Sequence, residues 1–422
     1  MKIFALILFA LTYVLMIALQ KQRPWVAVGS ALIFLVSGIV PMGELLDAID
    51  FNVLLMLAGT MGTVSLFIES RMPNKMAEAL LRRSPNVMWV VVYMSLFAGV
   101  VSAFVDNVAT VLMIAPVGLA IAKKLNISPV GMIISIAVSS NLQGAATLVG
   151  DTTSIMLGGY ADMTFIDFIW MEGKPSIFFA VELGALVTVP VIMFLFRDNR
   201  EKITVSEHTE VTNYVPTVLL CLNVLLLILA SFVENRPELT NGVICVGIFL
   251  VGMIHSRIMR GDMDVVKQAV REIDFETLCL LAGLFVVIRG ITNVGLIDDI
   301  SNIIVSLGGD NLFLLYSIIV WVSVVCSAFV DNIPYVATML PVVSAMAATL
   351  GVEPYLLFFG LLTGATLGGN LTPIGASANI AGIGILRKAG YEVKNTDFLR
   401  IGVPFTLCAV LTGYVFCWIF WA

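Results

Sequence analysis

Long apolar runs are the feature of this sequence that most limits its fold. They recur from Phe4 to the last residues, and each is about 17 to 25 residues long, the length that a helix needs to cross the hydrocarbon core of a bilayer. Apolar residues make up 59% of the chain and charged residues only 12%, whereas soluble domains carry roughly 25% charged residues. These values exclude a soluble fold and predict an all-α polytopic membrane protein, surrounded by lipid, with no separate polar domain.

An internal duplication is the second constraint. The hexapeptide SAFVDN at 102–107 recurs letter for letter at 327–332, which is 225 residues later. Several separated blocks that keep one offset indicate a repeat. We therefore expect a first repeat at 1–200, a polar linker at 201–213 and a second repeat at 214–422. The other matching blocks, at an offset of 225 or 224, are 116–117 with 341–342, the set Thr147, Gly150 and Ile155 with Thr372, Gly375 and Ile380, 49–51 with 273–275, and 57–59 with 281–283.

The apolar pattern predicts ten spanning segments and, between them, two helix-loop-helix units. The units cover 86–123 and 311–349, and each holds one copy of SAFVDN near its middle. A unit of this kind is either a re-entrant hairpin or a pair of full crossings, and the sequence is compatible with both. The spanning segments are expected near 3–20, 24–41, 51–69, 128–159, 175–196, 214–233, 240–258, 275–292, 355–386 and 401–421.

The distribution of basic residues predicts the orientation. If each unit enters and leaves on one side, one face of the membrane receives all but four of the 23 lysines and arginines, and the exceptions are Lys2, Lys174, Arg236 and Arg289. By the positive-inside rule that face is cytoplasmic, together with the central linker, in the cell's inner or plasma membrane. Five crossings then separate equivalent points, so the second half inserts upside down. An inverted-topology repeat of two five-span halves is a recurring plan of secondary transporters.

An aspartate and an asparagine stand together in each unit, as Asp106-Asn107 and as Asp331-Asn332. One interpretation places them in solvated loops, where both residue types favour turns. The other places them at hairpin tips inside the membrane, where a carboxylate is costly unless it faces protein, water or an ion. Carboxylate and amide oxygens are ligands for a hard cation, and a carboxylate can also accept a proton. We favour the second interpretation and expect a sodium site at these four residues.

Polar residues interrupt the span that follows each unit, at 141–154 and at 368–379. Glycines, hydroxyls, amides and Pro373 make these stretches poor continuous helices. Unwinding them frees backbone carbonyls for a cation and exposes a helix N-terminus that suits an anion. Close packing through small residues is the competing explanation, but it does not account for the amides and acids. The binding residues expected here are Asn141, Thr147, Gly150, Asp151 and Thr152 in the first stretch, and Asn370, Thr372, Gly375, Ser377 and Asn379 in the second.

Other kinds of chemistry have little support in the sequence. The six cysteines show no CxxC spacing, and the two histidines are too few for a metal cluster. No glycine-rich stretch ends in the GK[ST] of a nucleotide-binding loop. We therefore expect no cofactor, no catalytic site and no nucleic-acid partner, and transport energy from a gradient of Na⁺ or H⁺. Glu182 lies alone within a span and its role stays open, whereas Asp50, Asp274 and Glu69 are expected at the membrane interface.

At these residues the sequence resembles the ion transporter superfamily, in the citrate-transporter-like branch that holds the ArsB arsenite permeases, the P protein and, more distantly, NhaD-type sodium/proton antiporters. The stretches SAFVDNVATVLMIAPV, SAFVDNIPYVATMLPV and LGGNLTPIGASANIAGIGIL carry the resemblance, which covers essentially the full chain. The P-protein-like pattern expects GDPPN in the first broken helix, where this chain has GDTTS at 150–154. The first half therefore departs from that pattern on the surface that would face the substrate.

The resemblance implies a homodimer of scaffold and transport domains that works by an elevator-like movement. It implies that each hairpin tip forms a sodium clamp with the broken helix of its own half. The expected function is an ion-coupled secondary active transporter of a small anion or a metalloid oxyacid such as arsenite. A sodium/proton antiporter and a passive anion channel are the alternatives. The implied clamps are Asp106 and Asn107 with 147–151, and Asp331 and Asn332 with 372–376.

Overall fold

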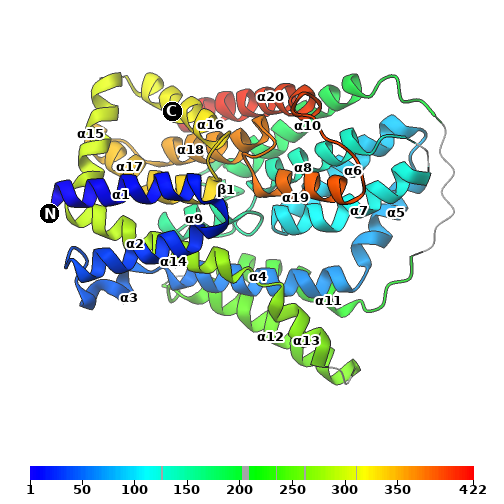
Figure 1. Ribbon diagram of the computed structural model, residues 1–422, viewed down its shortest axis with the longest axis horizontal. Coiled ribbons are helices and arrows are strands. Elements are labelled where there is room, and N and C mark those ends of the chain that lie inside the picture. Colours follow the sequence, from blue (N-terminus) through cyan, green and yellow to red (C-terminus); the bar gives the residue numbers. More distant parts are fainter. Residues whose placement is uncertain (125–126, 202–208, 234, 261–262, 310) are drawn as a thin grey trace.

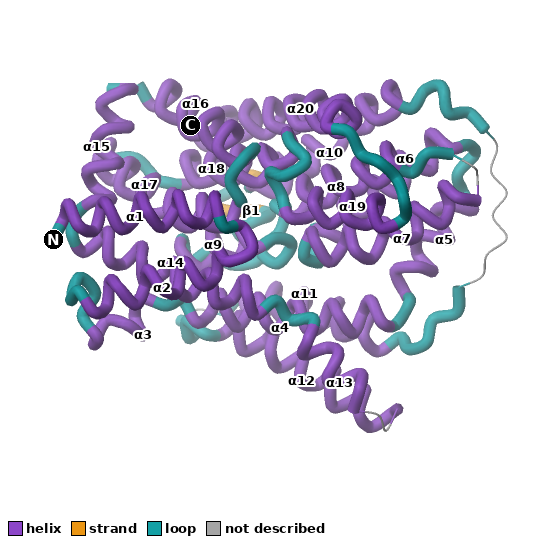
Figure 2. The backbone as a smooth tube through the Cα atoms, in the orientation of Figure 1, coloured by secondary structure: helices purple, strands orange, loops and turns teal. Residues whose placement is uncertain are grey.

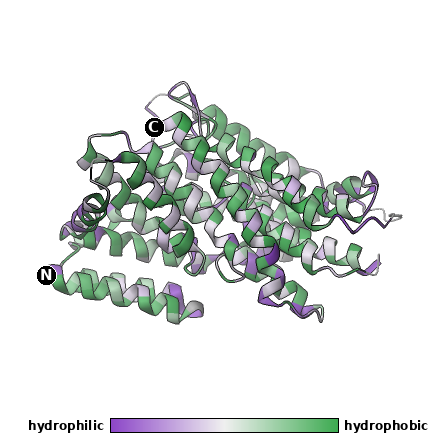
Figure 3. Cartoon of the chain, turned by 90° about the horizontal axis from the view of Figure 1, so that it is seen from above, coloured by the Kyte–Doolittle hydropathy of each residue, from purple (hydrophilic) through white to green (hydrophobic). Residues whose placement is uncertain are grey.

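The computed structural model describes residues 1–124, 127–201, 209–233, 235–260, 263–309 and 311–422, and it is helical almost throughout (Figures 1 and 2). Among the described residues the strands form one short antiparallel pair, β1 (Trp170–Met171) and β2 (Lys174–Pro175), in which Trp170 lies opposite Pro175. The all-α prediction is thus confirmed. Figure 3 shows apolar residues along most of the helices and hydrophilic residues concentrated in the loops.

Seven of the described helices are long and apolar enough to cross a membrane, and an eighth span is counted if α15 (Leu296–Gly308) and α16 (Leu312–Ser327), bent by 117°, form one. Shorter apolar helices accompany them. The long helices are α4 (Phe51–Glu69), α7 (Asn107–Lys124), α10 (Ile177–Leu195), α12 (Thr240–Arg260), α14 (Phe275–Asn293), α17 (Asn332–Leu350) and α20 (Asn395–Trp421). The shorter ones are α1 (Lys2–Ala18), α2 (Arg23–Val36), α6 (Val87–Ser102), α8 (Val130–Gly144), α11 (Val215–Ala230) and α18 (Tyr355–Gly368).

Several short helices were not expected from the span pattern. In α5 (Met72–Arg82), Ala77 and Leu81 are buried while Arg82 is exposed, so the helix has one apolar face. The search for long apolar runs does not indicate such a helix, because polar and apolar residues are interspersed along its sequence. The other unexpected elements are α3 (Leu45–Ala48), α13 (Met263–Arg271) and the 3₁₀ turns η1 (Gln20–Gln22), η2 (Met42–Glu44) and η3 (Gly369–Leu371). The short helices α9 (Thr152–Tyr160) and α19 (Ser377–Lys388) are instead the second parts of the two spans that were predicted to be interrupted.

The helices are arranged in two layers (Figure 1). One contains α2, α4, α11, α12, α13 and α14, in which α4 packs on α12 and α14 packs on α2. The other contains α6 to α10 and α16 to α20, in which α6 packs on α8, α16 on α18, and α10 on α20. The hairpin of α6 and α7 lies at the right of Figure 1 and the hairpin of α16 and α17 lies at the left. The two hairpins therefore approach the centre from opposite ends of the molecule.

Equivalent positions of the duplicated sequence make equivalent contacts. A Cβ on Gly59 would lie 2.3 Å from the backbone carbon of Cys245, and one on Gly283 would lie 2.7 Å from the backbone carbon of Ala27. Each glycine thus permits its helix, α4 or α14, to touch the backbone of a neighbouring helix. These helices also begin alike: Asp50 accepts a hydrogen bond from the backbone N–H of Val53 at 2.9 Å, and Asp274 from that of Thr277 at 3.0 Å.

The expected linker at 201–213 is only partly described, since 202–208 lie outside the described residues. Its last residues contact the first half of the chain. The backbone N–H of Thr209 donates to Glu78 Oε2 at 2.7 Å, and that of Thr212 donates to the carbonyl of Ser70 at 3.1 Å. Thr209 and Thr212 therefore lie against α5 and the residues that precede it.

Replacing Gly59 or Gly283 with alanine is expected to lower thermal stability, because the added methyl group meets backbone that cannot move aside. Overpacking of this kind costs about 1–3 kcal/mol, which outweighs the gain of about 1 kcal/mol in helix propensity. Melting in detergent, followed by intrinsic fluorescence, measures the change. Gly247→Ala in α12 is the matched control, because a Cβ there meets nothing within 4 Å. Equal melting temperatures for the Gly59 and Gly247 variants would contradict the tight crossing.

Candidate functional site

Each hairpin turns at its aspartate, which caps the helix that follows. Asp106 Oδ1 accepts hydrogen bonds from the backbone N–H groups of Val108 at 3.0 Å and Ala109 at 3.1 Å, at the start of α7. Asp331 accepts one from Ile333 at 3.2 Å, at the start of α17. These bonds satisfy amide groups that a helix start leaves unpaired. The capping role explains why the residue that ends each hairpin turn is an aspartate.

The neighbouring asparagines are buried inside the protein. Asn107 is 7% exposed and Asn332 is 6% exposed. A loop on the outer surface of the membrane domain would expose both amides to water. The structure therefore places both Asp-Asn pairs within the helical layers, against the broken helices.

Both spans that were predicted to be interrupted are broken. The first ends as α8 at Gly144 and resumes as α9 at Thr152, and the second ends as α18 at Gly368 and resumes as α19 at Ser377, with the turn η3 between them. The unwound stretch of each half contacts the hairpin of the same half. A hydroxyl at the same place in each repeat makes this contact: Thr147 donates to the carbonyl of Ala103, and Thr372 donates to that of Ala328.

One glycine in each unwound stretch is required by a close approach of backbones. A Cβ on Gly150 would lie 2.5 Å from the carbonyl oxygen of Gly144, and a Cβ on Gly375 would lie 2.6 Å from that of Gly369. Both would also meet the backbone of the hairpin turn within 3.0 Å. A side chain at either position would push the unwound stretch off the hairpin.

A cluster of buried amides joins the two halves behind the hairpin tips. Asn141 Nδ2 donates to Asn370 Oδ1 at 2.8 Å and to Asn379 Oδ1 at 3.0 Å, while Asn141 Oδ1 accepts from Asn107 Nδ2 at 3.0 Å. Asn370 and Asn379 donate in turn to backbone carbonyls of Val138 and Gly369. Asn141, Asn370 and Asn379 are fully buried. The cluster, which we call the asparagine cluster (Asn107, Asn141, Asn370 and Asn379), thus ties both broken helices together.

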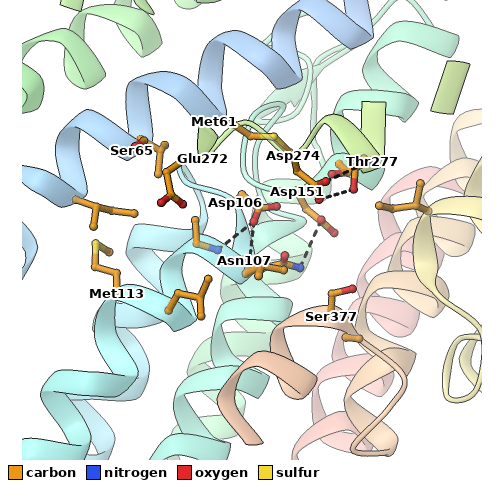
Figure 4. Close-up of a pocket in the computed structure, with 18 of the residues that line it drawn as sticks. Met61, Ser65, Asp106, Asn107, Met113, Asp151, Glu272, Asp274, Thr277 and Ser377 are labelled. Carbon is orange, nitrogen blue, oxygen red and sulfur yellow. Dashed lines mark hydrogen bonds between the residues drawn. The ribbon is translucent and has the colours of Figure 1, made fainter. Parts of the chain in front are cut away.

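A cavity of about 460 Å³ lies in front of the hairpin tips, between the two layers. Such a volume is within the range of small-molecule sites. Figure 4 shows Asp106, Asp151 and Asp274 around the same space, with Met61 and Ser65 of α4 opposite the hairpin residues. Every charged side chain among the described residues that line it is acidic, and none is a lysine or an arginine. The six carboxylates are Asp106, Asp151 and Asp331 from one layer, and Glu69, Glu272 and Asp274 from the other.

The predicted site residues divide into two groups. One group lines the cavity, and the other lies behind it, where its hydrogen bonds and small side chains hold the broken helices in place. The lining group is Asp106, Asn107, Asp151, Thr152, Asp331, Asn332 and Ser377. The supporting group is Asn141, Thr147, Gly150, Asn370, Thr372, Gly375 and Asn379.

Asp274 and Glu69 were expected at the membrane interface, but both line the cavity. Hydropathy locates each of them at a helix end along the chain, but it does not show that this end faces the other layer. The sequence did hold one signal: Ile-Asp-Phe at 273–275 repeats the same tripeptide at 49–51. Thr277 and Glu272 also line the cavity and were not singled out.

Glu182 has a partner within the protein. Gln143 Nε2 donates to Glu182 Oε2 at 3.1 Å, which joins α10 to α8. This pair lies outside the set of residues that line the cavity. Glu182 therefore does not face the site formed by the hairpin tips.

Comparison with known proteins agrees with the sequence resemblance. The family model CitMHS, described as "Citrate transporter", matches residues 11–364. An uncharacterized transporter of Mycobacterium tuberculosis is 30% identical over 432 residues, which cover 99% of this chain and 98% of that protein. The P protein of Homo sapiens is 25% identical over 88% of this chain, which matches 53% of the P protein.

A solved structure shares the fold. The YdaH transporter of Alcanivorax borkumensis, whose structure is described as having an unusual topology, superposes with a TM-score of 0.62 at 14% sequence identity, over 92% of this chain and 88% of that one. The sequence match over most of the chain identifies the family, and the structural match identifies the fold. This chain therefore belongs to the CitMHS citrate transporter family of the ion transporter superfamily, and it is a secondary transporter of the membrane.

Proposed function

We propose that the protein is an ion-coupled secondary transporter whose central cavity binds a cation, with the first clamp of Asp106, Asn107 and Asp151 as the binding centre. The observation that carries the proposal is the acidic lining of the cavity. Carboxylates from both layers face it, and no basic side chain is found among its described lining residues. Oxygen ligands of this kind suit Na⁺ or an exchangeable proton.

The same charges disfavour a free anion. Two like charges about 4 Å apart repel by roughly 4 kcal/mol at an effective dielectric constant of about 20. A polycarboxylate such as the citrate in the family's description would meet this repulsion at the tip of the first hairpin. Sodium/proton antiport, in which the two ions compete for the carboxylates, therefore accounts for the cavity better than uptake of a small anion or passage through an anion channel.

Transport of a neutral metalloid acid such as arsenite is the second candidate. The cavity is far larger than an ion, and part of its wall is formed by the apolar side chains of Met61, Leu112 and Met113. A small uncharged solute would not be repelled by the carboxylates. In that case the first clamp would hold the coupling cation beside the solute.

The architecture supports an elevator-like cycle in an inverted repeat. The hairpins come from opposite ends of the molecule (Figure 1), and the asparagine cluster ties the two broken helices together. In this proposal the layer of α6 to α10 and α16 to α20 moves as one body past the layer that holds α4 and α14. The repeats would be 1–200 and 214–422, joined by a cytoplasmic linker. The layer that holds α4 and α14 would be available for a homodimer contact.

A flux assay in proteoliposomes tests the function. With a pH-sensitive dye inside and a potassium diffusion potential clamped by valinomycin, external Na⁺ is expected to drive proton movement when no other solute is present. Choline chloride in place of NaCl is the control. Saturable arsenite uptake with no Na⁺-driven proton movement would replace the first candidate with the second, and citrate uptake that is independent of cations would contradict a cation site.

Neutralising the carboxylates of the hairpin tips and of the first broken helix is expected to abolish this flux. Asp106→Asn, Asp151→Asn and Asp331→Asn each keep the size of the side chain but remove a charge that faces the cavity. For Asp106 and Asp151, which belong to the proposed binding centre, a loss of about 3 kcal/mol of cation binding corresponds to roughly a hundredfold weaker apparent affinity for Na⁺. Asp198→Asn is the control, since this aspartate is 93% exposed outside the cavity. Wild-type flux in the Asp106 and Asp151 variants would remove both from the mechanism.

Truncating the centre of the asparagine cluster is expected to destabilise the protein. In Asn141→Ala, the Oδ1 atoms of Asn370 and Asn379 lose their donor, and each unsatisfied buried group costs about 1–3 kcal/mol. Melting in detergent checks this. Asn223→Ala is the matched control: this asparagine of α11 is 1% exposed, but its Oδ1 accepts no hydrogen bond from the described residues. A smaller loss for Asn141→Ala than for Asn223→Ala would contradict the role of the cluster.

A further inference from the structure

Arg23 reaches across the two layers to the tip of the second hairpin. It lies at the start of α2, and its Nη1 is 2.8 Å from Asp331 Oδ2. Its Nε donates to the carbonyl of Met16 in α1 at 3.1 Å, which fixes the direction of the guanidinium. The side chains of Arg23 and Asp331 are only 18% and 16% exposed. The pair is therefore a largely buried ion pair at the edge of the cavity.

The first hairpin has no such partner. Among the described residues, Asp106, the repeat counterpart of Asp331, accepts only from backbone N–H groups of its own helix, and no basic side chain forms an ion pair with it. Close to it stands a second carboxylate, Asp151, which accepts from Asn107 Nδ2 at 3.5 Å. The counterpart of Asp151 in the second repeat is Ala376.

The two clamps thus carry different formal charges. The first holds two carboxylates, Asp106 and Asp151, which face the cavity and offer negative charge to a cation. The second holds one carboxylate, Asp331, and a guanidinium already lies against it. A Na⁺ ion at the second clamp would have to displace Arg23, whose charge can neither be lost by deprotonation nor leave the chain.

We propose that Arg23 serves as a tethered cation of the second clamp, so that the transporter binds one coupling cation per cycle, at the first clamp, rather than one in each half. This inference rests on the proposed function, because it concerns the number of ions in the same transport cycle. In this proposal Arg23, which lies outside both hairpins, determines whether one or two coupling ions bind.

The Na⁺ dependence of flux in proteoliposomes tests the inference. The wild-type protein is expected to respond to external Na⁺ with a Hill coefficient near 1. In Arg23→Gln, Asp331 becomes an open carboxylate, and the Hill coefficient is expected to rise toward 2. Arg23→Lys keeps the charge and is expected to keep a value near 1. Lys21→Gln removes a nearby exposed charge that has no place in the clamp, and it is expected to behave as the wild type.

A double variant tests whether Arg23 acts by balancing the charge of Asp331. Asp331→Asn alone leaves Arg23 unpaired beside the cavity and is expected to suppress flux, whereas Arg23→Gln combined with Asp331→Asn removes both charges and is expected to restore it with a Hill coefficient near 1. Failure of this rescue, a wild-type Hill coefficient near 2, or an unchanged coefficient in an active Arg23→Gln variant would each overturn the inference. Absence of Na⁺-driven flux in the wild-type protein would instead overturn the proposed function.

Discussion

The cost of an unpaired polar group inside a bilayer is the constraint on which the rest of this structure depends. Amides and carboxylates at mid-membrane are stable only if protein, water or an ion satisfies them. Here the Asp-Asn turns cap helices, and the asparagine cluster satisfies amides from both halves with one another. The broken helices are stable because their polar atoms have these hydrogen-bond partners. Asp106 and Asp151, which face the cavity with no ion pair to a basic side chain of the described residues, are the groups left for an ion.

Duplication supplies the framework of the site, and departures from it supply the asymmetry. The threonine contacts of Thr147 and Thr372 and the helix caps of Asp50 and Asp274 are the same in both repeats. Asp151 has an alanine as its counterpart, and Asn141, which joins the two halves, has a threonine, Thr366. Two copies of one scaffold therefore hold a site whose halves are chemically different.

The family match identifies the fold of this chain, whereas the charges of the cavity bear on what it binds. Its relatives include an uncharacterized transporter and the P protein, and the family description names citrate. A shared fold fixes where a site lies, whereas the charges of the side chains decide what enters it. In this chain carboxylates from both layers line that place.

The sequence by itself determined the membrane class, the duplication, the hairpin turns and the positions of both helix breaks. These features depend on local composition and on the identity between two segments, and both can be seen in the amino-acid sequence alone. It also singled out Asp106, Asp331 and Asp151, all of which line the cavity. Only the tertiary structure decided that Asp274 and Glu272 of the other layer face them, and that Arg23 lies against Asp331. Contacts between layers depend on how helices far apart in the chain are packed, and neither hydropathy nor repeat spacing carries that information.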